Sequence, residues 1–469
     1  MSVKVTVMKF GGTSVEDGPA FERVAHIVDS YSQERPVVIV SAMSRVTDAL
    51  LSSLRSAAQG EIGAARRSLE EHLERHLEVA RSLGGPARPD TILLIERVRQ
   101  EIRGLLESAA ASRMTSAGLQ DIVASYGERL SASLLTVVLD EHGLPASYVD
   151  AGRCILTDEE HGKARPLPSH TRRRTRAELE PLLRAKRIPV LGGFIAATMK
   201  GATTTMGRGS SDYTATLVSA ALEARETQIW TDVNGVMTAD PLLIKTARTV
   251  PQLSYAEAEE LARFGAKVLH PKMIQPAAEK RIPVRICNSR APGQTGTLIC
   301  ARVPAARGTV KAIAHKTGMT TVEIISTPAM MANGLRHGVQ AIYDRHRTAV
   351  DVVAISEVGI SLASAETGAL SCIIEDLQRL GSVNVRRDRA IISCVGEGLQ
   401  RAPGNVTKLL SAFREVDSTL TWSSTSSSNC VLVVAADCAD SFIRRLHHAI
   451  FEHDVRERAR SRFAVSERE

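Results

Sequence analysis

The chain has 469 residues, of which 43% are hydrophobic and 24% charged, a composition typical of a soluble globular protein with about three domains. A net charge of +7 with only 3% aromatic residues favours small anionic ligands and offers few stacking platforms for single-stranded nucleic acid. No apolar run approaches the roughly 20 residues of a membrane span, and the seven cysteines lack C-x-x-C spacing, which favours reduced thiols in the cytoplasm and argues against a metal cluster.

The first predicted element is a strand over residues 3–8, which alternates in polarity and lacks the features of a signal peptide. It leads into Lys9-Phe-Gly-Gly-Thr-Ser-Val15, where a basic residue at a strand end precedes a glycine-rich turn. This order is typical of phosphate handling, although the spacing is not that of a P-loop. A second strand, residues 36–40, delivers the segment from Ser41 to Thr47 at its carboxyl end, where open α/β sheets bind ligands.

Helical periodicity follows over residues 61–83 and 92–105. Pro86 and Pro89 separate these segments, so we predict a structural helical hairpin. A further helix is predicted for residues 119–141 and contains Glu128. On the local pattern alone, Glu128 is most simply a solvated helix charge.

The stretch from Gly192 to Thr214 is rich in glycine, threonine and serine and follows the apolar run 188–191. We interpret it as the end of a strand, a polar loop, and a helix that begins near Ser211. Glycine amides can approach an anion closely, and a helix N-terminus offers its positive dipole end. The stretch therefore predicts an anion-binding cradle containing Arg208 and Asp212, with a solvated linker as the alternative.

The alternation of strands and helices continues to about residue 300. Residues 227–230 predict a strand that ends at Thr231 and Asp232, residues 255–264 a helix that leads to Lys267, and residues 283–287 a last strand. This alternation predicts an α/β domain over residues 1–300, with a parallel sheet covered by helices on both faces.

Two similar units follow this domain, over residues 310–388 and 389–455. Each shows the order strand, helix, strand, strand, helix, which is typical of ferredoxin-like βαββαβ modules. Neither carries a glycine-rich anion loop. We therefore interpret them as binding or assembly modules.

Five short motifs occur one after another along the chain. They are KFGGTSV at Lys9, SYGERLS at Ser125, TTTMGRGSSDYTA from Thr203, WTDVNGV at Trp230 and FGAKVLHP at Phe264. In this order and spacing the chain resembles the aspartate kinases of the amino acid kinase superfamily along essentially its full length. The helical insertion and the two C-terminal units are similar to those of the long monofunctional form, in which an amino acid kinase-like parallel-sheet sandwich is followed by two ACT modules.

The resemblance implies transfer of the γ-phosphoryl of ATP to the β-carboxylate of L-aspartate, with Mg²⁺, giving 4-phospho-L-aspartate for lysine, threonine and methionine biosynthesis. An aspartate carboxylate, with a pKa of about 3.9, is already an anionic nucleophile and needs no general base. What the reaction needs is in-line positioning and relief of repulsion between two anions.

The resemblance also assigns roles to residues. It implies that Lys9 contacts the transferring phosphoryl group and that Asp212 orients this lysine. It implies that Arg208 holds the substrate α-carboxylate as a fork and that Glu128 receives the ammonium group. The remaining implied residues are Ser41 and Thr47 for the substrate, and Gly11, Gly12, Thr231, Asp232 and Lys267 for the nucleotide, with no metal held by the protein alone.

Three positions depart from the commonest pattern of the family. Ala202 and Leu242 stand where an arginine is frequent, and Met237 stands where an aromatic residue is common. Lys245 lies three residues after Leu242 and could supply the cation. These departures bear on nucleotide affinity more than on reaction type.

The first C-terminal unit resembles the effector-binding module of lysine-sensitive aspartate kinases at Asp351, Ser356, Glu357 and Val358. There Asp351 would pair with the effector ammonium, and the backbone near Met331 would bind its carboxylate. Ala332, Leu335 and Arg336 depart from the lysine-binding pattern. We expect a homodimer or higher homo-oligomer inhibited by lysine, with threonine as the alternative effector and an absence of feedback as the third possibility. A kinase for another carboxylate and a weakly catalytic amino-acid sensor are the alternative functions.

Overall fold

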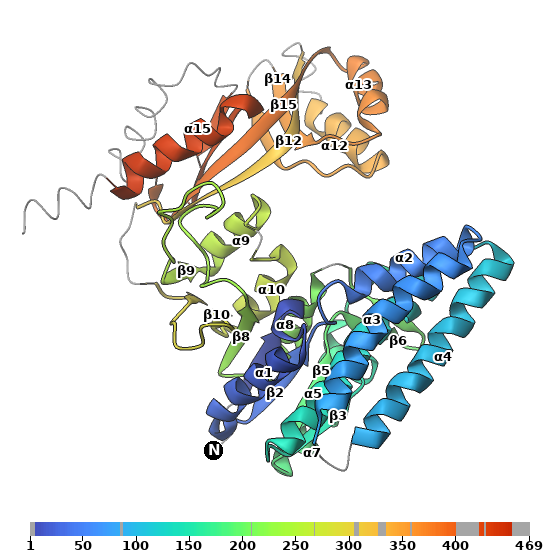
Figure 1. Cartoon of the computed structure of the whole chain (residues 1–469). Helices are drawn as coiled ribbons and strands as arrows, with labels where there is room; N and C mark the ends of the chain where they lie inside the picture. The colour runs from blue at the N-terminus through green and yellow to red at the C-terminus, as the bar shows by residue number, and fades with distance from the viewer. Residues whose placement is uncertain are drawn as a thin grey trace, which may run out of the picture. The chain divides into compact units, whose positions relative to one another are not determined.

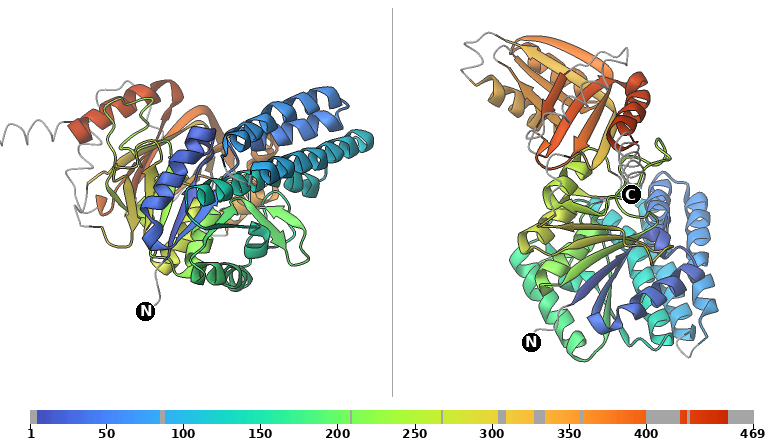
Figure 2. Two further views of the ribbon diagram at one scale, coloured as in Figure 1. Left: turned by 60° about the horizontal axis from the view of Figure 1, so that its bottom comes forward. Right: turned by 90° about the vertical axis from the view of Figure 1, so that its left-hand side faces the viewer.

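The computed structural model describes residues 5–84, 88–207, 209–266, 268–303, 309–326, 334–356, 359–399, 422–425 and 428–452. The chain divides into two compact units, shown as ribbons in Figures 1 and 2. The amino-terminal unit comprises Met1–Val236, Pro251–Tyr255 and His270–Val303. The carboxyl-terminal unit comprises Met237–Val250, Ala256–Leu269 and Pro304–Glu469.

The amino-terminal unit is built on an eight-stranded sheet of order β3-β5-β2-β1-β8-β10-β11-β9. The strands are β1 (Thr6–Phe10), β2 (Pro36–Val40), β3 (Ala146–Val149), β5 (Ile188–Gly192), β8 (Glu226–Thr231), β9 (Gln252–Ser254), β10 (Val284–Asn288) and β11 (Thr297–Cys300). Pairing is parallel from β3 to β10, as predicted, but β11 is antiparallel to β10. The connection between β10 and β11 is too short for a crossover, so the chain returns beside the strand it has left.

Helices cover both faces of this sheet (Figure 2). One side carries α1 (Gly18–Ser30), α2 (Val46–Ala58) and α5 (Ala117–Glu141), and the other carries α7 (Pro168–Arg184), α8 (Ser210–Leu222) and α10 (Pro271–Lys280). The two-residue alternation of β1 places Met8 and Phe10 in the core shared with α1 and α5. Lys9, between them, faces α8. Strand alternation therefore aims this lysine at one helix.

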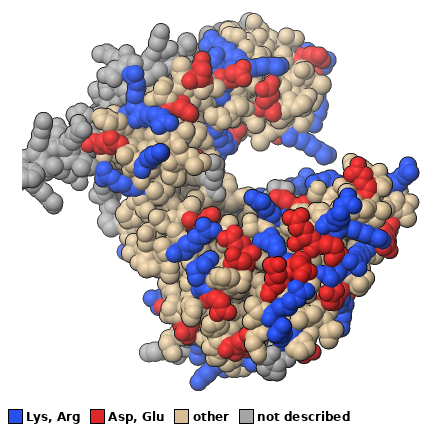
Figure 3. Space-filling view, in the orientation of Figure 1, with Lys and Arg blue, Asp and Glu red and all other residues tan. Residues whose placement is uncertain are grey.

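The predicted helical hairpin is present as α3 (Ile62–Ser82) and α4 (Arg88–Ser112). Its buried stripe includes Leu69, Leu73 and Ile102 and joins the core of α2 and α5. Ion pairs such as Arg103–Glu70, with 2.6 Å between Nη2 and Oε1, link its two helices. Lys/Arg and Asp/Glu side chains are interspersed over this surface in Figure 3, which fits a structural element.

Helix α5 is long and apolar enough, by length and composition, to cross a membrane. However, 72% of its apolar window is buried inside the fold. It packs against β3 and β5 of the sheet and against α1 and α2. These are the surroundings of a core helix.

The stretch from Gly192 to Thr214 is more regular than the polar loop that we predicted. It contains β6 (Ile195–Thr198) and β7 (Thr203–Thr205), which join β4 (Leu156–Thr157) in a three-stranded sheet. Thr204 and Thr205 are buried. The loop interpretation was wrong here because threonine, although polar, is β-branched and favours a pleated, half-buried surface.

The carboxyl-terminal unit contains a six-stranded antiparallel sheet of order β13-β14-β12-β15-β17-β16. Its strands are β12 (Ala312–Ile325), β13 (Val352–Ile355), β14 (Gly359–Ala365), β15 (Ser382–Val395), β16 (Trp422–Thr425) and β17 (Asn429–Ala435), and its helices include α9 (Tyr255–Arg263), α12 (Leu335–Arg345), α13 (Leu370–Gln378) and α15 (Ala436–His447). Strands β12 and β15 have 14 residues each and pair along almost their whole length. They run through two separate hydrophobic cores, one under α12 and α13 and one under α15.

This arrangement agrees with two ferredoxin-like modules that share one continuous sheet. The expected boundary near residue 389 falls inside β15, beside Asp388, whose φ is 53°. The first helix expected for the second module would fall in residues 400–421, which lie outside the described residues.

A buried acidic residue attaches α9 to the sheet of the carboxyl-terminal unit. Glu257 is fully buried and lies 2.7 Å from the ammonium of Lys311. Its other oxygen accepts a hydrogen bond from the amide of Glu397 at 2.9 Å. These contacts make residues 256–269 part of this unit, although they precede β10 in the chain.

Candidate active site

A cleft of about 340 Å³ opens at the carboxyl ends of β1 and β2, where the sequence predicted a ligand site. Its walls come from the turn after β1, the segment after β2, α5, and the start of α8. The lining residues are Lys9, Gly12, Ser41, Ala42, Met43, Ser44, Arg45, Thr47, Asp48, Leu51, Glu128, Phe194, Gly209, Ser211 and Asp212. The structure thus brings together five of the predicted catalytic and substrate residues, namely Lys9, Ser41, Thr47, Glu128 and Asp212.

Lys9 and Asp212 form an ion pair, with 2.6 Å between Nζ and Oδ1. Both side chains are largely buried, at 11% and 16% exposure. Asp212 lies in the first turn of α8, where the helix dipole stabilises a carboxylate. The pair therefore fixes the lysine ammonium at the wall of the cleft.

The glycine turn after β1 serves two purposes. The amide of Gly11 donates a 3.0 Å hydrogen bond to the carbonyl of Trp230 and so extends the sheet. Gly12 meets the segment after β2 so closely that a Cβ there would lie 2.8 Å from the carbonyl oxygen of Ala42. The amide of Gly11 would have to leave this bond to contact a phosphate, whereas Gly12 lines the cleft directly.

Glu128 is buried in the wall of the cleft, with 4% exposure, so the local interpretation as a solvated helix charge was wrong. Burial raises its pKa to about 8, against opposing contributions from backbone hydrogen bonds and the charge of Lys9. Its Oε2 has no hydrogen-bond partner among the described residues. A neutral, incompletely bonded acid in a cleft is suited to receive a cationic ligand group.

Two glycines allow α5 to pack closely enough against its neighbours to place Glu128 in the wall of the cleft. A Cβ at Gly127 would lie 2.7 Å from the Cβ of Ala42, and one at Gly192 would lie 3.0 Å from the Cβ of Glu128. Real Cβ atoms essentially never approach as closely as the first distance and rarely as closely as the second. Gly127, in the SYGERLS motif, and Gly192, at the end of β5, therefore position this carboxyl group.

Several lining residues were missed by the sequence analysis, and Arg45 is the most informative of them. It has φ 70° and ψ −5°, a left-handed conformation, at the N-cap of α2. Its position between Ser41 and Thr47 in the sequence was an available signal, because it is the basic residue of that segment. Asp48, Phe194 and Ser211 also line the cleft.

Two of the expected nucleotide residues lie at the end of β8, next to β1, and are not part of the cleft lining. Thr231 donates from Oγ1 to Oδ1 of Asp232 at 3.2 Å, and its carbonyl accepts from the amide of Ser289 at 2.8 Å. Ser289 is in turn bonded to Ser14 of the turn after β1, with 2.8 Å between the hydroxyl oxygens. Arg208 and Lys267 lie outside the described residues.

The expected effector residues belong to the carboxyl-terminal unit. Asp351 forms an ion pair with Lys316 of β12, so its carboxylate already has a cationic partner. The amide and hydroxyl of Ser356 both donate to the carbonyl of Gly359, at 2.9 and 3.2 Å. Glu357 and Val358, like Met331 and Ala332, lie outside the described residues, whereas Leu335 is buried and Arg336 exposed.

Comparisons with known proteins agree with this geometry. The profile of the amino acid kinase family matches residues 4–288, which is more than half of the chain. The lysine-sensitive aspartokinase 3 of Escherichia coli is 32% identical over 96% of this chain and 100% of its own length. The crystal structure of E. coli aspartokinase III with aspartate and ADP, in its R-state, has a TM-score of 0.83 at 31% identity, covering 96% of this chain and 100% of that one. The T-state structure with lysine and aspartate has a TM-score of 0.76 at 31% identity, covering 95% and 99%.

Proposed function

Because the chain belongs to the amino acid kinase family, as one of its aspartate kinases, we propose that it transfers the γ-phosphoryl group of ATP to the β-carboxylate of L-aspartate. The product would be 4-phospho-L-aspartate, the activated precursor for lysine, threonine and methionine. The observation that carries the proposal is one cleft that holds both the Lys9–Asp212 ion pair and the buried carboxyl group of Glu128.

Glu128 suits the amino group of the substrate. Its unpartnered Oε2 would accept a hydrogen bond from the ammonium, and the added positive charge would favour the ionised acid. Family resemblance assigns Arg208, which follows β7 in the sequence, to the α-carboxylate of the substrate. Ser41 and Thr47, on the cleft wall, would contribute hydroxyl groups.

Lys9 suits the transferring phosphoryl group. Its ammonium is held by Asp212 and would stabilise the negative charge shared by the β-carboxylate and the γ-phosphate during in-line transfer. None of the described lining residues is a histidine, which agrees with a carboxylate nucleophile that needs no general base.

The nucleotide and its metal ion complete the proposal. Thr231, Asp232 and the turn at Gly12 lie at adjacent strand ends and would hold ATP, and family resemblance alone adds Lys267 to this set. Mg²⁺ is usually held by one or two carboxylates together with nucleotide phosphates, and Asp48 and Asp212 in the cleft are suitable oxygen donors. When bound, Mg²⁺ would neutralise part of the phosphate charge.

Regulation and assembly also belong to the proposal. We assign the carboxyl-terminal modules, over residues 310–388 and 389–455, to binding an amino-acid effector, with lysine favoured over threonine. The lysine sensitivity of the E. coli relative and the Asp351 carboxylate support this choice. A homodimer or higher homo-oligomer in the cytoplasm is the expected state, in keeping with seven cysteines that are all free thiols.

Hydroxamate trapping tests the proposed reaction directly. Purified protein is given Mg-ATP and hydroxylamine with aspartate, with glutamate, or with no acceptor. We expect hydroxamate with aspartate alone. Equal product with glutamate would indicate a kinase for another carboxylate, and no product with either, despite lysine binding, would indicate an amino-acid sensor.

A further inference from the structure

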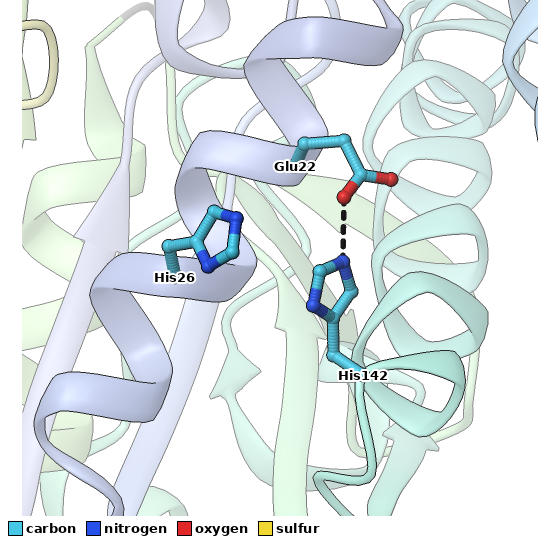
Figure 4. A group of neighbouring side chains, drawn as sticks. All are labelled: Glu22, His26 and His142. Atoms are coloured by element: carbon cyan, nitrogen blue, oxygen red, sulfur yellow. Dashed lines mark hydrogen bonds and ion pairs between the residues drawn. The ribbon is translucent and has the colours of Figure 1, made fainter.

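Two histidines and a glutamate meet on the amino-terminal unit, away from the residues of the cleft. Glu22 and His26 belong to α1, and His142 is the C-cap residue of α5. The Nε2 atom of His142 lies 2.5 Å from Oε2 of Glu22. Figure 4 shows the three side chains directed into the space between the two helices.

The backbone produces this convergence. Glu22 and His26 are four residues apart, so they share one face of α1. The ring of His142 packs edge-to-face on that of His26, with 5.2 Å between ring centroids and 80° between planes. One ligand atom from each residue lies within 4.8 Å of the other two. Zinc binds such nitrogen and oxygen atoms at about 2.0–2.2 Å, so a single ion placed among the three atoms could be reached by all of them after side-chain adjustment.

The end of α5 adds a second reason to expect a cation. The last turn of this 25-residue helix has no basic residue, and it contains Asp140 and Glu141. Asp140 lies 3.8 Å from Arg187, which is outside that turn, so the negative end of the helix dipole itself has no basic residue of the turn to offset it. A cation bound at the C-cap residue would interact favourably with this helix end.

We propose that Glu22, His26 and His142 bind Zn²⁺ or a similar imidazole-preferring divalent ion, which clips α1 to the end of α5. Two imidazoles and a carboxylate are a frequent three-ligand set for zinc, with water in the fourth position. Imidazole disfavours Mg²⁺, which prefers oxygen ligands. The clip would stabilise the packing of α1 on the helix that carries Glu128, and it does not depend on the proposed roles in catalysis.

Equilibrium dialysis of the untagged, full-length protein with Zn²⁺ provides the test. We expect one zinc ion per chain at pH 7.5 to be lost in His26→Ala and in His142→Ala. His337→Ala is the matched control, because this histidine is exposed on the carboxyl-terminal unit. It should bind as the wild type does.

A second variant keeps the test decisive if a histidine variant folds poorly. Glu22→Gln retains the size of the side chain but loses its charge, and we expect its zinc affinity to fall at least tenfold. Zinc at a hundredfold excess over its dissociation constant should raise the Tm of the wild type by a few degrees and that of Glu22→Gln much less. Absence of zinc binding by the wild type, or equal binding by all four variants, would overturn the proposal.

Discussion

The ammonium of Lys9 lies 2.6 Å from the carboxylate of Asp212, so a residue on the central strand of the sheet is paired with the first turn of α8. Sequence separates these residues by 203 positions, and the parallel sheet brings them together. The pair fixes the position of the lysine ammonium at the wall of the cleft. A preorganised charge of this kind acts on the transition state without reorganisation.

Replacement of Lys9 tests this role. We expect Lys9→Ala to lower kcat by roughly a thousandfold, because one preorganised electrostatic donor is typically worth about 10²–10³ in rate. Circular dichroism should show an intact fold. Lys200→Ala is the matched control, because Lys200 is an exposed lysine of the same unit, paired with Glu159 at the surface. A Lys9→Ala enzyme that kept most of its turnover would contradict the proposed mechanism.

The raised pKa of Glu128 predicts how the activity with aspartate depends on pH. With a pKa near 8, the free enzyme holds this acid in its neutral form at pH 7, whereas ammonium binding requires the carboxylate. We therefore expect kcat/KM for aspartate to rise by up to tenfold per pH unit below about pH 8 and to level off above it. Glu128→Gln should raise KM for aspartate about 10- to 100-fold and remove this slope. An unchanged profile in the variant would exclude Glu128 as the titrating group.

The same residue predicts how stability changes with pH. Its pKa is higher in the folded state than the usual 4.5, so between about pH 4.5 and 8 the folded state binds the proton more tightly. The contribution of Glu128 to the free energy of unfolding should therefore fall as pH rises through that window, by up to about 1.4 kcal/mol per unit. Urea unfolding of the wild type and Glu128→Gln at pH 5, 6.5 and 8 measures this difference. A stability difference that does not change with pH would contradict the prediction.

Arg45 has a left-handed, strained backbone conformation and also lines the cleft. A non-glycine residue in the left-handed region costs roughly 1–2 kcal/mol, so Arg45→Gly should raise the free energy of unfolding by about 1 kcal/mol. The variant loses a cation from the cleft, and we expect KM for a substrate to rise several-fold with little change in kcat. Arg45→Ala separates the two effects, because it should raise KM without relieving the strain. An unaltered KM in both variants would show that Arg45 does not contact a substrate.

Substitution of Leu242 tests whether a cation at this position affects the affinity for ATP. The leucine side chain is 79% exposed, next to an Asp240 carboxylate that accepts from the amide of Leu242 at 2.9 Å. We expect Leu242→Arg to lower KM for ATP several-fold and leave KM for aspartate unchanged, because it restores a cation that is frequent in the family. Leu242→Gln serves as the control for side-chain length without charge. An unchanged KM for ATP would indicate that Lys245 or another group already fills this role.

Lys316 and Asp351 test the effector proposal. The Lys316 ammonium pairs with the Asp351 carboxylate, which is the group that an effector ammonium would use. We expect Lys316→Ala to lower the lysine concentration for half-inhibition several-fold and Asp351→Ala to raise it at least tenfold, measured at subsaturating aspartate. Lysine inhibition that survived Asp351→Ala unchanged would exclude this site, and inhibition by threonine alone would change the effector.

Much of the fold followed from the sequence because its signals are local. The helices α3, α4 and α5 are long and periodic, and their apolar stripes predicted α3 and α5 to within two residues, whereas α4 extends four residues before and seven residues after its predicted span. The strand β2, which precedes Ser41, is a short apolar run, and β1 ends next to a glycine-rich turn. The general location of the cleft followed from these two strand ends.

Other features depend on tertiary contacts that no local pattern reveals. The pKa of Glu128 results from burial, which arises because Gly127 and Gly192 admit α5 to the sheet. The β6–β7 hairpin was missed because threonine is a polar residue and suggested a solvated loop, whereas Thr198, Thr204 and Thr205 are buried in the fold. The cluster of Glu22, His26 and His142 joins helices that are far apart in sequence, so only the fold brings its members together.

The buried contact between Glu257 and Lys311 affects how the chain can be divided by genetic engineering. A protein ended near residue 300 would keep Glu257 but lose both the Lys311 ammonium and the Glu397 amide that satisfy it. The Glu257 carboxylate would then lose two of its partners, and its burial on α9 would be less well compensated. Variants that lack the proposed effector binding are therefore better sought by point substitution than by deletion, and chimaeras with foreign carboxyl-terminal modules should exchange residues 237–250 and 256–269 together with the C-terminal segment.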